Sequence, residues 1–297
     1  MKKKSKGDIA IDAIVYTIFI AVALVCLYPL VYCVSMSISG DYPILRNEIV
    51  LWPKDMTIKA YITVFQNEKI LKSLLYAVYY TVTGTVIQVI ATLLYGYVYS
   101  KKNFVFRKQL IVFSLIPMVF GGGMIPSFLV IKALGLYGSY WALILPTCVG
   151  LWNAMIAKTF FLTTIPDELY DSAAMDGCGQ FQTFIRIVLP LSKTIIAILA
   201  LYAAVGYWND YFGPMVYITD SNMRPLQVVL AEILSASSKS ESISSLLTDA
   251  SASIENTVGS IRMKYVLIVV SCAPIIAVYP FIQKYFVKGV MIGSVKG

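Results

Sequence analysis

Histidine is absent from this chain of 297 residues. The imidazole ring is the commonest general base and the commonest metal ligand in proteins, so its absence removes the usual basis for catalysis or metal binding. The cysteines show no paired spacing, which argues against both a disulfide framework and a zinc site. We therefore predict neither an enzyme nor a metalloprotein. The five cysteines are Cys26, Cys33, Cys148, Cys178 and Cys272.

The chain also lacks the phosphate-binding loop G-x-x-x-x-G-K-S/T. In many ATPases, the backbone amides and the lysine of that loop hold the nucleotide phosphates. We therefore expect this chain to bind no cofactor of its own. Any ATP that drives its function must be bound and hydrolysed by another polypeptide.

Charged residues are scarce, at 13% of the chain against 58% hydrophobic residues, and the mean hydropathy is +0.75. This composition is far from that of a soluble domain and places the chain in the lipid bilayer. Six apolar runs are long enough to cross a bilayer as helices, and the ten-residue alternation of a membrane barrel is missing. The predicted fold is an all-α integral membrane protein with six transmembrane helices, near 11–38, 73–100, 109–131, 138–163, 191–216 and 263–287.

Basic residues gather at the ends of these spans that would share one side of the membrane. Fourteen bases against six acids on that side account for the entire formal net charge of +8. The positive-inside rule places this side in the cytoplasm, so residues 1–10 and 288–297 are predicted to be cytoplasmic termini of a plasma-membrane protein. The positive net charge is then explained by the orientation of the chain in the membrane, and it does not indicate nucleic-acid binding.

A cleavable signal peptide is the alternative interpretation of the N-terminal segment. The apolar core of such a peptide is about 7–15 residues long. The apolar run from Ile9 to Val34 is longer, and we therefore favour an uncleaved first span.

The predicted loop 217–262 faces outward and holds ten serines between Ser235 and Ser260. A few apolar residues at helical spacing interrupt them, such as Ile243 and Leu247. We interpret the loop as a flexible or partly helical external flap, with a plain solvated connector as the alternative.

The predicted cytoplasmic loop 164–190 carries explicit helix punctuation. Pro166 suits a first helical position, and the acids after it complement the positive end of a helix dipole. Gly177 suits a left-handed cap, and a bend is expected there before a second short helix over Phe181–Leu189. Small residues at 172–174 would let another surface approach closely, so we predict a docking element; an amphipathic hairpin lying on lipid headgroups is the alternative.

The same segment carries a family resemblance. The pattern D-S-A-A-M-D-G-C followed by I-x-L-P, at Asp171–Pro190, resembles the EAA loop of permease subunits of ATP-binding-cassette importers, with Asp171 for the usual Glu and Ser172 for the first Ala. Over nearly the whole chain the resemblance is to the carbohydrate branch, the maltose-type permeases. It is closest to the complex-polysaccharide and aldouronate subgroup of Gram-positive bacteria. The segments that carry it are 28–39, 51–57, 125–128, 134–137, 208–214 and 285–297.

The resemblance implies an importer of the type I fold that takes up oligosaccharides by alternating access. Its partners would be a second permease subunit, two cytoplasmic ATPases that use ATP and Mg, and an external solute-binding lipoprotein. The loop would be the coupling helix seated on an ATPase. Its contact residues would be Asp171, Ser172, Ala173, Ala174, Met175, Asp176 and Gly177.

A polar and aromatic cluster in the fifth predicted span is the candidate substrate pathway. Aromatic faces suit sugar rings, and amide or carboxylate groups suit hydroxyls. An aromatic belt with a solvated carboxylate near the outer interface is the alternative. The cluster comprises Tyr207, Trp208, Asn209, Asp210 and Tyr211.

Three consecutive glycines, Gly121, Gly122 and Gly123, interrupt the third predicted span. They could form a broken helix beside a cavity or allow close helix packing. We favour flexibility near a gate.

Other functional classes fit the sequence less well. An importer of the same family for a non-carbohydrate solute remains an alternative. A stand-alone secondary carrier would need buried ionisable groups and repeated halves, neither of which is visible.

Overall fold

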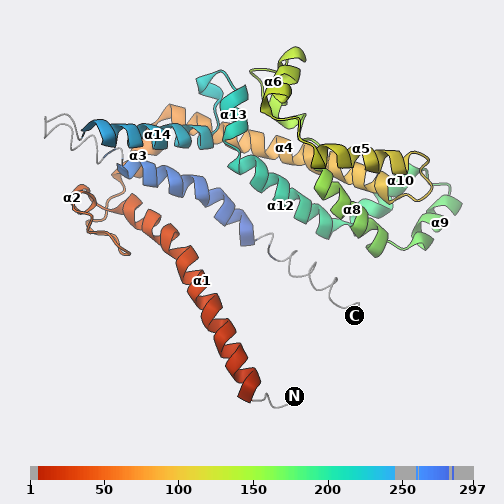
Figure 1. Cartoon of the computed structure of the whole chain (residues 1–297), viewed down its shortest axis with the longest axis horizontal. Coiled ribbons are helices and arrows are strands. Elements are labelled where there is room, and N and C mark those ends of the chain that lie inside the picture. The colour runs from red at the N-terminus through yellow and green to blue at the C-terminus, as the bar shows by residue number, and fades with distance from the viewer. Residues whose placement is uncertain (1–5, 245–258, 260, 281–282, 284–297) are drawn as a thin grey trace. The chain divides into compact units, whose positions relative to one another are not determined.

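The computed structural model describes residues 6–244, 259, 261–280 and 283. Every regular element among these residues is helical (Figure 1), in agreement with the predicted all-α class. The chain divides into two compact units, which are described separately. The first comprises Met1–Leu71 and Leu230–Ala273, and the second comprises Lys72–Val229 and Pro274–Gly297.

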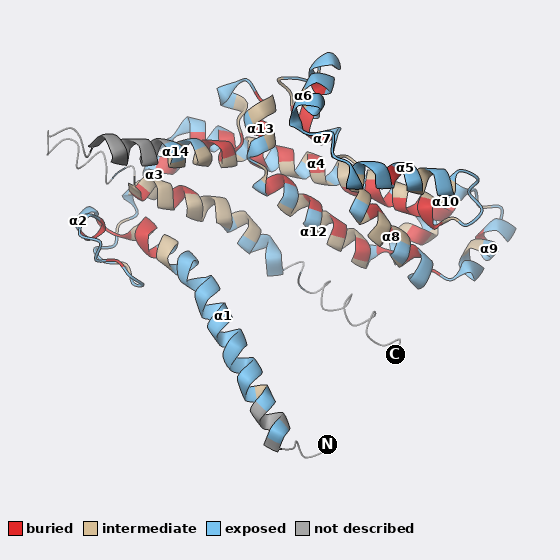
Figure 2. Ribbon diagram, viewed as in Figure 1, coloured by how far each residue is buried: buried red, intermediate tan, exposed pale blue. Residues whose placement is uncertain are grey.

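The first unit is dominated by α1 (Lys6–Ile38), which contains a 27-residue apolar stretch, Ile11–Ser37. At 1.5 Å per residue this stretch is about 40 Å long, enough to cross a bilayer with tilt. Its side chains are exposed along most of its length (Figure 2), as expected of a helix in contact with lipid. The predicted span 11–38 is therefore confirmed as a helix.

Shorter elements complete the first unit. They are α2 (Asp41–Leu45), α3 (Lys59–Gln66), residues 230–244 of α14 (Leu226–Ser244) and residues 261–273 of the helix Ile261–Pro280. A small core of Met36, Ile44 and Ile49 forms where α2 meets the end of α1. The buried guanidinium of Arg262 pairs with Asp41, so the charge taken out of water has a partner.

The second unit contains residues 72–100 of α4 (Glu68–Ser100) and most of the remaining helices. The apolar face of α4 packs with α8 and α12, and the buried side chains on these helices form one core cluster (Figure 2). The other elements are α5 (Arg107–Val119), α6 (Met124–Ala133), α7 (Trp141–Ile144), α8 (Leu151–Thr164), α9 (Asp167–Met175), α10 (Gln180–Thr183), the π-helical turn η1 (Phe184–Val188), α11 (Leu189–Leu191), α12 (Lys193–Asn209), α13 (Phe212–Tyr217) and the 3-10 turn η2 (Ser221–Met223).

Two glycines allow α4 to approach its neighbours closely. A Cβ atom on Gly96 would lie 2.7 Å from Cβ of Ala157 in α8 and 3.0 Å from the carbonyl oxygen of Ala154. A Cβ atom on Gly84 would lie 2.8 Å from the ring of Tyr207 in α12. Because real Cβ atoms do not pack that closely, Gly96 is needed for this spacing of α4 and α8, and a side chain at position 84 would require the ring of Tyr207 to shift.

Three of the six predicted spans are not single helices. The run 109–131 consists of α5 and α6, which meet at an angle of 119°. The run 191–216 begins with α12, which is bent by 84° from the preceding helical segment Gln180–Leu191, and its helix ends at Asn209. The run 138–163 is divided between the short α7 and α8. Long apolar composition therefore did not distinguish a straight helix from a broken one.

The helices that are long and apolar enough to cross a membrane number three in the described part of the chain, or up to five if each bent pair is one span. The run predicted at 73–100 is a single helix within α4, and that predicted at 263–287 is helical as far as Pro280. Its residues 281, 282 and 284–287 lie outside the described residues, as do the tail 288–297 and residues 1–5. In the predicted loop 217–262, η2 and α14 bear out the partly helical interpretation, whereas 245–258 and 260 lie outside the described residues.

Candidate functional site

The predicted docking element forms two short helical segments joined by a glycine-containing turn. Pro166 is extended and precedes α9, so it occupies the cap and not the first helical position that we expected. Gly177 adopts φ +74°, and the amides of Gly177 and Cys178 donate to the carbonyls of Ala174 and Ala173 at 3.1 and 2.9 Å. This pair of bonds is a Schellman cap, which confirms the left-handed end predicted at Gly177.

The side chains of this element divide into an exposed set and an inner set. Met175 is 89% exposed and Phe181 is 69% exposed, although both are large and apolar. Among the predicted contact residues Ala173 alone is buried, so its side chain faces the interior of its own unit and not a partner. The remaining predicted contact residues are exposed: Asp171, Ser172, Ala174, Asp176 and Gly177.

Lys101, the residue directly after α4, contacts an aromatic side chain of α9. The Nζ atom of Lys101 lies 3.1 Å from the ring centroid of Tyr170 and 4.7 Å from that of Tyr97. A cation above an aromatic face is stabilised by about 0.5–2 kcal/mol, depending on its exposure to water. The Tyr97 hydroxyl also donates to the carbonyl of Gln180 at 3.3 Å, which connects α4 with α10.

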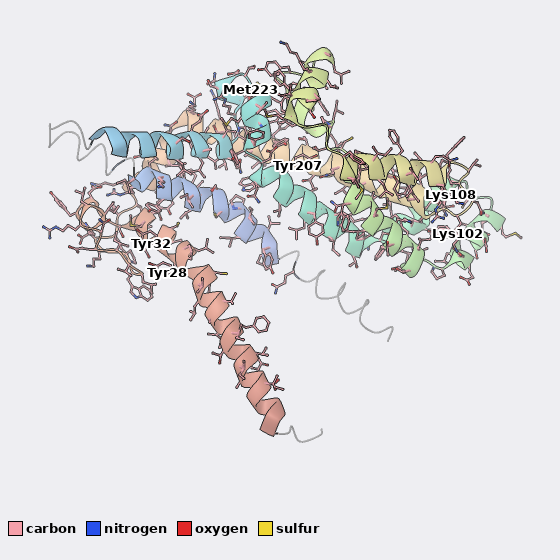
Figure 3. The ribbon with its side chains drawn as sticks, in the orientation of Figure 1. Tyr28, Tyr32, Lys102, Lys108, Tyr207 and Met223 are labelled. Carbon is pink, nitrogen blue, oxygen red and sulfur yellow. The ribbon has the colours of Figure 1, made fainter. Side chains whose placement is uncertain are left out.

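The next residue along the chain makes a second contact with α9. Lys102 Nζ donates to Asp167 Oδ2 at 2.8 Å, and both side chains are exposed (Figure 3 labels Lys102). An exposed pair of this kind contributes little to stability, because water and salt screen it. Asp167 and Tyr170 are three residues apart and therefore share one face of α9, so the two lysines contact that face at adjacent turns.

Burial and charge shift the ionisation of these groups. Burial lowers the pKa of Lys101 to about 8, with the charge of Asp167 acting in the opposite direction. The hydrogen bond from Lys102, and then its charge, lowers the pKa of Asp167. Burial, followed by the charge of Asp167, raises the pKa of Tyr170 to about 12. Lys101 thus remains mostly protonated at neutral pH and can act as a cation there.

A cavity of about 800 Å³ lies between the end of α4, the loop that follows it and α9. Tyr97, Lys101, Asp167, Tyr170 and Asp171 are among its lining residues. The helix α9 is therefore not packed solidly against α4. Side chains that line this space, Lys101 and Tyr170 among them, connect the two helices.

The predicted substrate cluster lies elsewhere in the same unit, at the end of α12. Asp210 is the residue directly after the last residue of that helix. Its Oδ2 accepts a hydrogen bond from the Tyr80 hydroxyl at 3.0 Å, and its Oδ1 accepts from the Gly213 amide at 3.0 Å. The carboxylate therefore fastens the α12–α13 turn to α4.

The other members of that cluster face different surroundings. Tyr207 is 5% exposed, packs edge-on against Tyr80 and shares a hydrogen bond of 2.9 Å with Thr147. Trp208 is also buried, whereas Asn209 and Tyr211 are exposed. The five residues are neighbours in space, but those open to a ligand in this chain are Asn209 and Tyr211, with Asp210 half-buried. Their role in a substrate pathway stays a prediction.

Gly121, Gly122 and Gly123 form the bend between α5 and α6. Gly123 adopts φ +80°, a conformation that side chains other than glycine rarely tolerate. Among the described residues no atom lies within 4 Å of a Cβ built on any of the three. The glycines therefore serve the bend and not close packing within this chain, and a gate remains a prediction.

Several residues at these sites were not singled out by their sequence pattern. Lys101 and Lys102 follow an apolar run, where basic residues indicate the cytoplasmic side of a span and not a contact with another helix. Tyr80 and Tyr97 are two of 21 tyrosines in the chain, and nothing in their sequence context sets them apart. The partners of these four residues lie 65 to 130 residues away along the chain. No group of three or more acidic or thiol side chains suited to a metal ion occurs in the part of the chain that the structure describes.

The tie between α4 and Asp210 can be tested by removing one hydroxyl. Tyr80→Phe deletes the donor to Asp210 and is expected to lower the stability of the folded protein by about 1–3 kcal/mol, because a half-buried carboxylate loses a partner. Tyr79→Phe, at an exposed tyrosine in the same turn, is the matched control. Thermal unfolding in detergent measures both. Equal stability of the two variants would contradict the tie.

Comparisons with known proteins identify the class of molecule. Residues 58–292 match the family described as "Binding-protein-dependent transport system inner membrane component". The chain is 40% identical to the polygalacturonan/rhamnogalacturonan transport system permease protein YtcP of Bacillus subtilis (strain 168), over 96% of this chain and 98% of that protein. It is 39% identical to Protein LplC of the same organism, over 93% and 91% of the two chains.

A solved structure agrees with these relatives. A chain of a bacterial ABC transporter involved in the import of the acidic polysaccharide alginate superposes with a TM-score of 0.84 and 28% identity, with 96% of this chain and 100% of that chain covered. The family consists of transport components, which confirms the prediction of a transport subunit and not an enzyme. On this evidence the chain belongs to the family of inner membrane components of binding-protein-dependent transport systems.

Proposed function

We propose that this chain is a permease subunit of an ATP-driven importer that takes up oligosaccharides. The observation that carries the proposal is the family match over residues 58–292, together with relatives that cover almost the whole chain. Because the chain lacks the phosphate-binding loop, we assign the binding of ATP and Mg to separate ATPase subunits. A second permease subunit, two cytoplasmic ATPases and an external solute-binding lipoprotein complete the proposed transporter.

The proposed substrates are oligosaccharides that contain uronic acids. The name of one relative specifies polygalacturonan and rhamnogalacturonan, and the similar solved structure is that of a transporter involved in the import of alginate, an acidic polysaccharide. Polygalacturonan also carries a carboxylate on each sugar. Asp210 in the candidate pathway already accepts hydrogen bonds from Tyr80 and Gly213, so its charge is partly screened from a passing anion.

The proposed topology has six membrane crossings with both termini in the cytoplasm. Three long helices and two bent pairs account for five of them. The remaining crossing would be made by α7 and α8 together, because the 14 residues of α8 extend about 21 Å, less than the ~30 Å thickness of the hydrocarbon core. Backbone groups at each break would need partners from protein or water.

The helix α9 is proposed as the coupling helix that contacts an ATPase. Met175 and Phe181 supply exposed apolar anchors, and Asp171 and Asp176 supply polar groups at their rim. The predicted contact residue Ala173 would not touch the ATPase; its buried side chain would pack α9 against the rest of its own unit. Closure of the ATPases would then displace α9 and shift the permease between inward and outward access.

Gly177 provides a test of the coupling role. Gly177→Val places a β-branched residue at φ +74°, so it strains the cap and redirects the chain after α9, although no atom of the described residues lies near its Cβ. We expect membrane insertion and subunit assembly to persist while uptake is lost. Uptake into proteoliposomes and co-purification of the ATPase measure the two properties.

The neighbouring Gly179 gives the matched control. It has an extended backbone with φ −67° and open space around its Cβ, so Gly179→Val should retain uptake. Gly177→Asn should lie between the two, because asparagine tolerates the left-handed region. Wild-type uptake by a stably assembled Gly177→Val transporter would refute the coupling role of this turn.

The substrate class can be tested with the complete transporter and its solute-binding protein. Oligogalacturonides, alginate oligomers and neutral arabino- and malto-oligosaccharides would be compared for binding and uptake. The proposal expects acidic oligomers to be taken up and to compete with one another. Uptake of neutral oligomers alone would overturn the acidic assignment, and binding of only amino acids or metals would overturn the carbohydrate assignment.

A further inference from the structure

The C-terminal end of α4 and the residues directly after it reach across the cavity to α9. Lys101 stacks on Tyr170, and Lys102 pairs with Asp167. We call these four residues the lysine clamp. Because the two lysines are adjacent and their partners share one face of α9, the lysine clamp contacts that helix at two neighbouring points on one face.

Few other side chains of α9 can perform this task. Ala173 is buried but carries a single methyl group, Asp171 lines the cavity, and Ser172 and Met175 are exposed. The cavity of about 800 Å³ beneath α9 leaves the helix without a continuous packed base. A displacement of α9 can reach α4 through the lysine clamp, and also through α8, which Ile165 and Pro166 join to α9 and which packs on α4 at Gly96.

The other contacts of α4 lead directly to the candidate substrate cluster. Tyr80 donates its hydroxyl proton to Asp210, and Gly84 lies under the ring of Tyr207. Tyr97 and Tyr80 are 17 residues apart on one continuous helix, about 25 Å along its axis. One helix thus touches both sites (Figure 3 shows Lys102 and Tyr207 apart in the unit).

We propose that the lysine clamp makes α9 and the C-terminal end of α4 move as one body, so that displacement of α9 is passed along α4 to the Tyr80–Asp210 contact. The four residues of the lysine clamp are positioning residues and touch neither ATP nor sugar. The proposal deepens the assignment of α9 as the coupling helix and rests on it. In the alternative case, α9 would move independently of α4, and the two helices would slide past each other during transport.

A reversible cross-link distinguishes the two cases. Lys102→Cys and Asp167→Cys would be combined in a chain whose five native cysteines are replaced by serine or alanine. The whole transporter, with ATPases, partner permease and binding protein, would be reconstituted in vesicles. Uptake of labelled oligogalacturonides per ATP hydrolysed would be measured before and after a short thiol-specific cross-linker joins the two positions.

We expect the reduced pair to lose about fivefold in uptake per ATP, within the usual range of coupling between sites. Cross-linking should restore the ratio, because it replaces the lost ion pair by a covalent tie. An inactive cross-linked transporter would show that the two positions must separate, and an unchanged ratio in the reduced pair would show that the contact transmits nothing. Either result overturns the proposal.

Two further sets of variants guard against misfolding and non-specific charge effects. Tyr170→Phe keeps the aromatic face for Lys101 and should retain coupling, whereas Tyr170→Leu should reduce it. Lys108→Met removes an exposed lysine at the start of α5 and should leave the ratio unchanged. The parent transporter separates the two proposals: if no ATPase co-purifies with it, the proposed function fails. If the ATPase does co-purify, an unchanged ratio in the reduced pair or an inactive cross-linked pair overturns the proposal on the lysine clamp alone.

Discussion

The close packing of α4 against α8 and α12 is the constraint on which the second unit depends. Gly96 and Gly84 lie where these helices meet, and a methyl group at either position would lie less than 3 Å from a side chain of the neighbouring helix. In lipid, where apolar side chains gain little from leaving the solvent, such close contact supplies much of the association between helices. With α4 held on two sides, its tyrosines are placed to reach α10 at one end and Asp210 at the other.

The sequence predicted local structure best where the signal itself is local. Asp167, Glu168 and Gly177 lie within eleven residues of one another, and α9 begins and ends where they indicate. The apolar runs predicted the membrane class but concealed the bend at Gly121–Gly123, because hydropathy carries no information on backbone direction. The contacts of Asp210 were also hidden, since its partner Tyr80 is 130 residues away and one tyrosine in an apolar helix resembles another.

The two lysines after α4 illustrate how one pattern can have two physical roles. Basic residues after an apolar run indicate the cytoplasmic side of a span. Lys101 and Lys102 fit that rule, yet their side chains also contact α9 through a ring and a carboxylate. The predicted membrane orientation and the attachment of α9 are therefore compatible roles for the same two lysines. Both lysines also line the cavity between α4 and α9.

The most direct test of the lysine clamp asks whether α9 and α4 keep their separation during the transport cycle. Spin labels at Leu94 on α4 and Ser172 on α9, both exposed, would report that distance by pulsed electron resonance in the assembled transporter. We predict the same distance distribution without nucleotide and with ATP trapped in the closed ATPases. A shift of the distribution between these states would contradict movement of the two helices as one body.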